Sequence, residues 1–133
     1  MSVAVLDSHA LLTLLRDEPG AGLVRSLMER AAENATSLHM TEVNYAEVQY
    51  IVRRQEGEKA WAGVASDLEA APIEFHPATR ALADLAAGYK ARFKLSLADA
   101  FAAALATEKR AELVTGDPEF EPLEPELRIH WLK

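Results

Sequence analysis

The chain has no cysteine among its 133 residues, which excludes disulfide bonds, thiolate zinc sites and a cysteine nucleophile. Its histidines are few and far apart in the sequence, so no two have the spacing of a paired metal site. They are His9, His39, His76 and His130. No apolar run reaches the roughly 20 residues of a membrane-spanning helix, and no basic signal-peptide start precedes the first apolar run. We therefore expect a soluble, cytoplasmic protein.

Basic residues are also scarce. The 14 Lys and Arg stand against 21 Asp and Glu, and the net charge is −7. This balance argues against a conventional nucleic-acid binder, which normally carries an excess of basic residues. Half of the residues are apolar, which indicates a folded core rather than disorder. The length predicts one domain spanning residues 1–133.

Short apolar runs alternate with helical patterns along the whole chain. Val3–Leu6 is apolar without alternation, the pattern of a strand covered on both faces of a parallel sheet. Together the patterns predict a three-layer α/β/α sandwich with a mostly parallel central sheet. The expected strands are 3–6, 37–40, 72–76, 113–115 and 127–131, and the expected helices are 8–16, 21–33, 41–55, 59–70, 79–93 and 97–109.

Four acids stand where such a sheet would bring them to one edge. Asp7 ends the first strand, and Asp117 lies two residues past the strand 113–115. In an open parallel sheet, ligands bind at the carboxyl ends of the strands. Helices that follow a strand begin at that edge too. Glu47 falls in the second turn of one such helix, and Asp99 in the first turn of another.

Several of these acids also have a structural interpretation. Asp7 is placed to cap the helix that follows it. Asp117 precedes Pro118, as a cap does when proline opens a helix. Ser96 and Asp99 have the spacing of a capping box.

Glu47 is harder to explain by structure alone. It follows Val43 by four residues and precedes Ile51 by four, so we place it on the stripe of its helix that faces the core, with Tyr50. A carboxylate there needs a partner, which a basic residue from elsewhere in the chain would also supply. Glu42, at the start of the same helix, suits the helix dipole and faces solvent.

The mutual repulsion of the acids decides how the group is interpreted. Two carboxylates about 5 Å apart repel by roughly 3 kcal/mol at an effective dielectric of about 20. Four together cost on the order of 10 kcal/mol, comparable to the whole stability of a domain. Protonation, an intruding Lys or Arg, or a divalent ion must offset this. Because no Lys or Arg adjoins Asp7, Glu47 or Asp117, we favour one or two Mg²⁺ or Mn²⁺ ions, which prefer oxygen ligands.

The four acids in order resemble the acidic signatures of PIN domains, and in particular of the VapC toxins of toxin–antitoxin pairs. They are Asp7 in "VLDSHALL", Glu47 in "MTEVNYAEVQY", Asp99 in "LSLADAFAAALA" and Asp117 in "LVTGDPEF". The resemblance extends from the first strand to the last and implies that all four bind metal. Thr115 matches a hydroxyl residue that commonly precedes the last acid by two, and Ser8 a small polar residue after the first.

The resemblance implies a Mg²⁺- or Mn²⁺-dependent endoribonuclease toxin that cleaves structured RNA of the tRNA or ribosomal RNA class. It further implies a homodimer and inhibition by a cognate VapB-type antitoxin, for which we add the hypothesis that a basic side chain enters among the acids. Glu119 is expected in solvent rather than in the site. The best candidates for RNA contacts also suit helix C-termini as cations. They are Arg53, Arg54, Lys90, Arg92 and Lys94.

Two other functions remain open on the sequence. A phosphatase with Asp7 as nucleophile would want a second acid two residues later, where His9 stands. A catalytically silent PIN-like protein-binding module would act through its partner, with a partner helix lying along helices 8–33. The leucines and alanines of those helices are equally suited to packing on the sheet. His39, His76 and His130 are interpreted as packing or edge residues.

Overall fold

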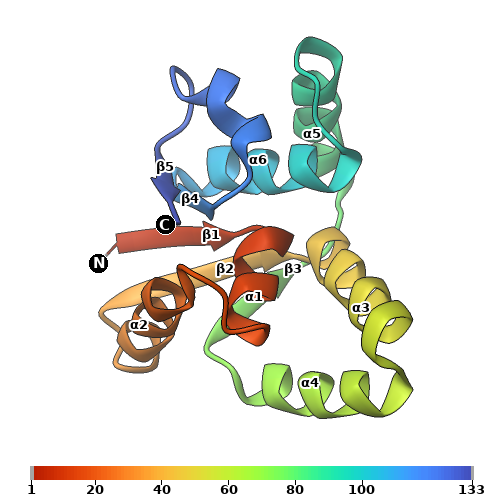
Figure 1. Ribbon diagram of the computed structural model, residues 1–133. Helices are drawn as coiled ribbons and strands as arrows, with labels where there is room; N and C mark the ends of the chain where they lie inside the picture. Colours follow the sequence, from red (N-terminus) through yellow and green to blue (C-terminus); the bar gives the residue numbers. More distant parts are fainter. Residues whose placement is uncertain (1, 133) are drawn as a thin grey trace.

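The computed structural model describes residues 2–132. Its strands form one sheet in the order β3-β2-β1-β4-β5, and every pairing is parallel. The strands are β1 (Ser2–Leu6), β2 (Thr36–Thr41), β3 (Ile73–His76), β4 (Glu112–Thr115) and β5 (Ile129–Trp131). Figure 1 shows helices on both faces of this sheet, so the predicted three-layer sandwich is confirmed.

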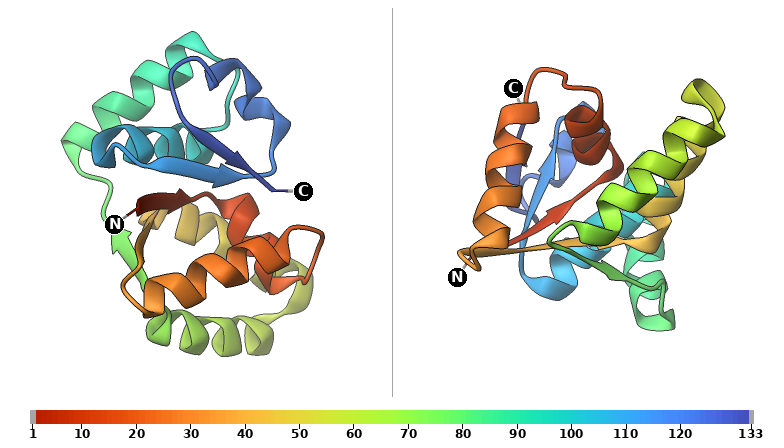
Figure 2. Two further views of the ribbon diagram at one scale, coloured as in Figure 1. Left: turned by 90° about the vertical axis from the view of Figure 1, so that its left-hand side faces the viewer. Right: turned by 90° about the horizontal axis from the view of Figure 1, so that it is seen from below.

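One face of the sheet is covered by α5 and α6, and the other by α1, α2 and α4 (Figures 1 and 2). The remaining long helix, α3, lies at the carboxyl ends of the strands and contacts both α1 and α6. The helices are α1 (Ser8–Leu15), α2 (Ala21–Ala32), α3 (Glu42–Glu56), α4 (Glu58–Ala70), α5 (Arg80–Arg92) and α6 (Leu97–Lys109). None of the helices described between residues 2 and 132 is long and apolar enough to cross a bilayer.

The first strand shows why its sequence is apolar without alternation. Val3 and Val5 pack into the cluster formed with α5 and α6, whereas Ala4 and Leu6 pack into the cluster formed with α2. Successive side chains of a strand point to opposite faces, and here both faces are covered. A parallel central strand therefore reads as a continuous apolar run.

Helix α6 is buried along most of its length. Every residue from Asp99 to Ala106 is buried, because the helix packs against α5, α3 and the sheet. The small side chains of its alanines allow α5, α3 and the sheet to pack closely against the helix. The same position carries Asp99, in the first turn, into a place that water hardly reaches.

The predicted element boundaries agree with the structure to within one residue, with two exceptions. The last strand begins only at Ile129, because Leu127 is buried beside the short 3₁₀ helix η1 (Pro118–Leu123). No helix was expected at 118–123, although Asp117 was interpreted as a cap. Gly57 separates α3 from α4 at a φ of 99°, a conformation that suits glycine.

The leucines of the first two helices serve the core. Leu11, Val24 and Leu27 are all buried, packed among residues of the sheet and of the neighbouring helices. The alternative in which helices 8–33 offer these side chains to a partner helix therefore loses its main support.

Candidate metal centre

Asp7 lies fully buried at the end of β1, and both of its carboxylate oxygens accept hydrogen bonds. The Ala10 amide donates to Oδ1 at 2.7 Å, so Asp7 does cap α1. The Thr115 hydroxyl donates to Oδ2. This contact spans 108 positions of sequence and exists because β1 and β4 are neighbours in the sheet. Each oxygen keeps a second lone pair, so the capping role leaves Asp7 able to bind an ion.

Asp117 is held by the turn that follows β4. Its amide donates to the Thr115 hydroxyl oxygen at 3.0 Å, and its Oδ1 accepts from the Glu119 amide at 2.9 Å. Asp117 thereby caps η1. Thr115 connects the two acids, since one hydroxyl donates to Asp7 and accepts from the backbone of Asp117.

Asp99 completes a close group of three acids. Its amide donates to Ser96 Oγ at 3.1 Å, which caps α6. Carboxylate oxygens of Asp99, Asp117 and Glu119 lie within 4.8 Å of one another. Glu119, expected from the sequence to point into solvent, is exposed and nevertheless belongs to this group. The short 3₁₀ helix turns it back toward α6.

The charges of neighbouring acids act on the two most buried carboxylates, Asp7 and Asp99. Burial, reinforced by the charges of Asp99 and Asp117, raises the pKa of Asp7 to about 7, against the lowering effect of its hydrogen bonds from Thr115 and Ala10. Burial also raises the pKa of Asp99 to about 7. The charges of Asp117, Glu47 and Glu119 add to this rise, and the Ser96 hydrogen bond opposes it.

Within residues 2–132, no ion pair involves any of these five acids. A fixed Lys or Arg therefore does not offset their repulsion. The donors that converge are carboxylate oxygens, which are the ligands preferred by Mg²⁺ and Mn²⁺. The residues present fit a divalent metal centre.

Glu47 reaches this region from α3, but not from the stripe that the sequence indicated. The buried stripe of α3 is Asn44, Val48 and Val52. Tyr50 is 48% exposed and Glu47 is partly exposed, so the expectation that they face the core was wrong. The apolar residues of α3 fit two adjacent stripes, either of which could face the core. The stripe that is buried contains the polar residue Asn44, so hydrophobicity alone does not identify it. Glu47 remains close enough to Asp99 for its charge to raise the pKa of that group.

Asn44 is the residue that the sequence did not reveal. It is fully buried, and its side-chain amide donates to Ser8 Oγ at 3.0 Å and to the Ala98 carbonyl at 3.1 Å. The Thr41 hydroxyl donates to its side-chain oxygen. These bonds tie together the N-terminal ends of α1, α3 and α6. Its place on the stripe i, i+4, i+8 with two valines was the signal available in the sequence.

Ser8 supports the site through this network rather than by touching the acids in the contacts observed among residues 2–132. Its hydroxyl donates to the Asn44 carbonyl at 3.3 Å. His9, the next residue, is exposed and lies directly over Gly116, in the turn between Thr115 and Asp117. A Cβ on Gly116 would come within 2.5 Å of the His9 ring.

The cations considered for RNA contact lie at the ends of α3 and α5, as expected, and several of them have partners. Arg53 pairs with Glu58 at 2.8 Å, and Arg92 makes two hydrogen bonds to Glu126. The Lys90 ammonium donates to the Leu95 carbonyl at 2.8 Å, in the loop that leads to α6. The remaining two, Arg54 and Lys94, are exposed.

Known proteins share the fold of this chain. The family model of the PIN domain matches residues 4–124. Among curated proteins, none matches this sequence. Similar solved structures include VapBC2 from Rickettsia felis bound to a DNA fragment from its promoter, at a TM-score of 0.78 and 16% identity, covering 98% of this chain and 99% of that chain.

Two further structures are similar. DNA-bound VapBC from Salmonella typhimurium has a TM-score of 0.75 and 16% identity, with 98% of both chains covered. Mycobacterium tuberculosis VapC20, a sarcin–ricin loop cleaving toxin, has a TM-score of 0.69 and 17% identity, covering 91% of this chain and 94% of that chain. At these identities the similarity is one of fold.

Proposed function

The chain belongs to the PIN domain family, and from this premise we propose that it is a cytoplasmic, Mg²⁺- or Mn²⁺-dependent endoribonuclease toxin. Its substrate is structured RNA of the tRNA or ribosomal RNA class. The observation that supports this most strongly is the meeting of Asp7, Asp99 and Asp117 at one edge of the sheet, with Glu47 and Glu119 in electrostatic reach of Asp99. Among residues 2–132, no cation is paired to these acids.

Each acid has its own part in this proposal. Asp99, Asp117 and Glu119 hold the ion, because their oxygens already lie within the span of one coordination sphere. Asp7 contributes through the lone pairs that its hydrogen bonds leave free. Glu47 supplies a further negative charge from the partly exposed side of the site. When bound, a divalent ion supplies an activated water for in-line attack on the phosphodiester and stabilises the leaving oxygen.

The protein's own residues prepare this chemistry by orienting the carboxylates. Thr115 fixes the rotation of Asp7, and the Ala10 amide fixes its other oxygen. Carboxylates must lose their protons to bind metal. Since burial raises the pKa of Asp7 and Asp99 to about 7, protons compete with the ion near neutral pH.

The partner we propose is a VapB-type antitoxin, in keeping with the VapBC complexes that share this fold. A basic side chain of the antitoxin would enter among the acids and take the place of the metal. We also propose that residues 1–133 act as one domain and assemble as a homodimer.

The test is cleavage of total tRNA and ribosomal RNA by the purified chain. We expect cleavage in the presence of Mg²⁺ or Mn²⁺. It should stop when a chelator is added, and the cognate antitoxin should suppress it. Asp99→Asn and Asp117→Asn each remove a ligand and should lower the rate by at least about 100-fold. Glu121→Gln is the matched control, because Glu121 is an exposed acid of the same 3₁₀ helix and should leave the rate unchanged.

Glu119→Gln tests whether Glu119 is a metal ligand. If it is, the variant should lose both cleavage rate and metal affinity. Undiminished cleavage by Asp7→Ala and Asp99→Ala would reject the assignment of the site. Metal binding with both RNA pools left intact would reject the substrate class while leaving the metal centre in place.

A further inference from the structure

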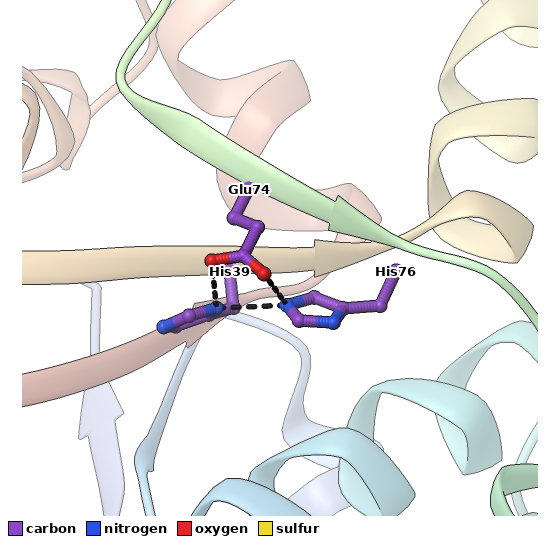
Figure 3. Close-up of side chains that lie close together, drawn as sticks. All are labelled: His39, Glu74 and His76. Atoms are coloured by element: carbon purple, nitrogen blue, oxygen red, sulfur yellow. Dashed lines mark hydrogen bonds and ion pairs between the residues drawn. The ribbon is translucent and has the colours of Figure 1, made fainter.

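A second group of metal-ligating side chains lies on the same molecule, away from the acids. His39 on β2 meets Glu74 and His76 on β3, the edge strand of the sheet (Figure 3). His39 is in register with Glu74, and Thr41 with His76. Side chains at alternate positions of registered strands share a face. The group therefore forms although His39 and His76 are 37 positions apart in the sequence, and their interpretation as separate packing residues was incomplete.

The donor atoms are already close to the spacing that one ion requires. His39 Nδ1 lies 2.8 Å from His76 Nε2 and 3.9 Å from Glu74 Oε1, and His76 Nε2 lies 3.6 Å from Glu74 Oε2. Ligands about 2.0–2.2 Å from a tetrahedral zinc ion are about 3.4 Å from one another. The two rings need to separate by roughly half an ångström for an ion to replace the hydrogen bond between them.

A neighbouring hydroxyl orients the buried ring. Ser37 Oγ lies 3.0 Å from His39 Nε2. If Nε2 donates its proton to this oxygen, the lone pair of Nδ1 points to His76 and Glu74. Metal-binding histidines typically have such a partner on the other ring nitrogen. Burial and the charge of His76 lower the pKa of His39, which keeps the ring in the neutral form that binds metal.

An ion can reach the group from solvent. The Glu74 side chain is 67% exposed, and the two imidazoles are 9% and 15% exposed. Ser37, His39 and Glu74 also line an open hollow of about 450 Å³ at this edge of the sheet. The site thus combines two sheltered nitrogens with one carboxylate at its mouth.

The group lies near the opposite end of α6 from the acids of the proposed nuclease site. The charges of His76, Glu74 and Lys109 act on His39. Lys109 ends α6, whereas Asp99 lies in its first turn. Ten residues of helix hold these two positions about 15 Å apart. The charge of Lys109 opposes a cation at His39, whereas the charge of Glu74 favours one.

We propose that His39, Glu74 and His76 bind a Zn²⁺ ion through two imidazole nitrogens and one carboxylate oxygen. Mixed nitrogen and oxygen donors suit zinc, whereas Mg²⁺ prefers oxygen alone. Three protein ligands leave a fourth position for water. The ion joins the edge strand β3 to β2 and stabilises that side of the sheet. This inference stands independently of the nuclease proposal.

The experiment is a Zn²⁺ titration of the full chain near neutral pH in excess Mg²⁺, which occupies the acids and leaves the imidazoles free. Histidine ring nitrogens are followed by NMR, and the melting temperature is recorded in parallel. One equivalent of Zn²⁺ should shift the ring signals of His39 and His76, leave those of His9 and His130 in place, and raise the melting temperature.

The variants test each ligand against a matched control. His76→Ala should weaken Zn²⁺ binding by at least about 100-fold, and Glu74→Gln should weaken it too without disturbing the fold, since Glu74 is exposed. Lys109→Gln should tighten it. His130→Ala is the control, because His130 lies 3.3 Å from Glu112 and has no second imidazole in the contacts described.

An Asp99→Asn/Asp117→Asn double variant should bind Zn²⁺ as the wild type does, which distinguishes this site from the nuclease centre. Absence of saturable binding, equal shifts at His130, or unchanged affinity in His76→Ala would each overturn the proposal.

Discussion

At the scale of single residues, Asp7 serves as a helix cap and is also proposed to bind metal. It caps a helix and is fully buried, which ordinarily marks a structural carboxylate. Its pKa is nevertheless raised to about 7, because burial and the neighbouring Asp99 and Asp117 outweigh the two hydrogen bonds. The hydrogen bonds hold this carboxylate in one orientation, and burial disfavours its ionised form. A divalent ion beside it would favour the ionised form.

Gly116 lies next to the His9 ring, and this contact leads to a prediction. Gly116→Ala should lower the free energy of unfolding by about 1 kcal/mol or less, because the added Cβ comes within 2.5 Å of the His9 ring, the end of an exposed side chain that can turn aside. In a His9→Ala background the same substitution should cost less than half as much. Denaturant unfolding of the four proteins gives the coupling energy directly.

Gly88→Ala is the matched control for this cycle. A Cβ at Gly88 meets nothing within 4 Å, and the residue lies inside α5. Replacing an exposed helical glycine by alanine should stabilise the chain by about 0.5–1 kcal/mol. An equal loss from Gly116→Ala with and without His9 would show that the ring is not what the glycine accommodates.

At the scale of elements, the acids gather where helices begin. Asp7 caps α1, Asp99 lies in the first turn of α6, and Asp117 caps η1. Helix N-termini carry partial positive charge, which favours nearby carboxylates. The arrangement offsets part of the repulsion among the acids, although the raised pKa values of Asp7 and Asp99 show that it does not offset all of it.

Asn44 holds these helix ends together, and Asn44→Leu tests it. The variant keeps a similar volume but leaves the Ser8 hydroxyl and the Ala98 carbonyl without their donor. We expect a loss of about 1–3 kcal/mol in unfolding free energy. Because α6 carries Asp99, Mn²⁺ affinity measured by calorimetry should fall as well.

Ala46→Gln provides the control on the same helix. Ala46 is exposed, and alanine and glutamine both favour helix. The free energy of unfolding should therefore change by no more than about 0.5 kcal/mol. If Asn44→Leu proved as stable as the wild type with unchanged metal affinity, the network would not be what positions the helices.

At the scale of the whole molecule, the acids connect stability to pH and to metal. Folding raises the pKa of Asp7 and of Asp99 from 3.8 to about 7. Between those two values the folded state binds more protons than the unfolded state does. The contribution of these groups to stability is therefore full below pH 3.8 and is lost as the pH rises through about 7.

The metal-free protein should thus lose up to about 1.4 kcal/mol per group for each pH unit in that window. Urea unfolding in the presence of a chelator, compared between wild type and Asp99→Asn, isolates this slope from other titrations. Saturating Mg²⁺ should flatten it, because the ion stabilises the charged carboxylates. Identical slopes in both proteins, with and without Mg²⁺, would contradict the electrostatic account.

The acidity of the chain also fits this view. The net charge of −7 argues against a conventional nucleic-acid binder, yet several of the acids are concentrated in one region. Two bound divalent ions would bring −7 to −3. The candidate RNA-contacting cations Arg53 and Arg92 are paired with glutamates, whereas Arg54 and Lys94 are exposed. A bound metal would add positive charge for a phosphate in the proposed site.

Much of the fold and of the site was predictable because the signals are local. The apolar run 3–6, the caps at Ser96 and Asp117 and the turn after Thr115 each depend on a few adjacent residues. Glu47 was placed on the wrong stripe of α3 because the true stripe contains Asn44, whose burial depends on hydrogen bonds from other helices. Glu119 is exposed, as predicted, and its approach to Asp99 and Asp117 could not be predicted because η1 is too short to show a periodic pattern.

The sequence by itself determined the alternation of strands and helices, the parallel sheet and the identity of the acids at its edge, since backbone geometry and hydrophobic periodicity act over neighbouring positions. Tertiary structure alone decided which side chains meet. Strand order placed Thr115 against Asp7, and the register of β2 with β3 placed His39 against His76. Such contacts depend on how distant segments pack, because the free energy of burying them is gained only when the whole sheet and its helices assemble.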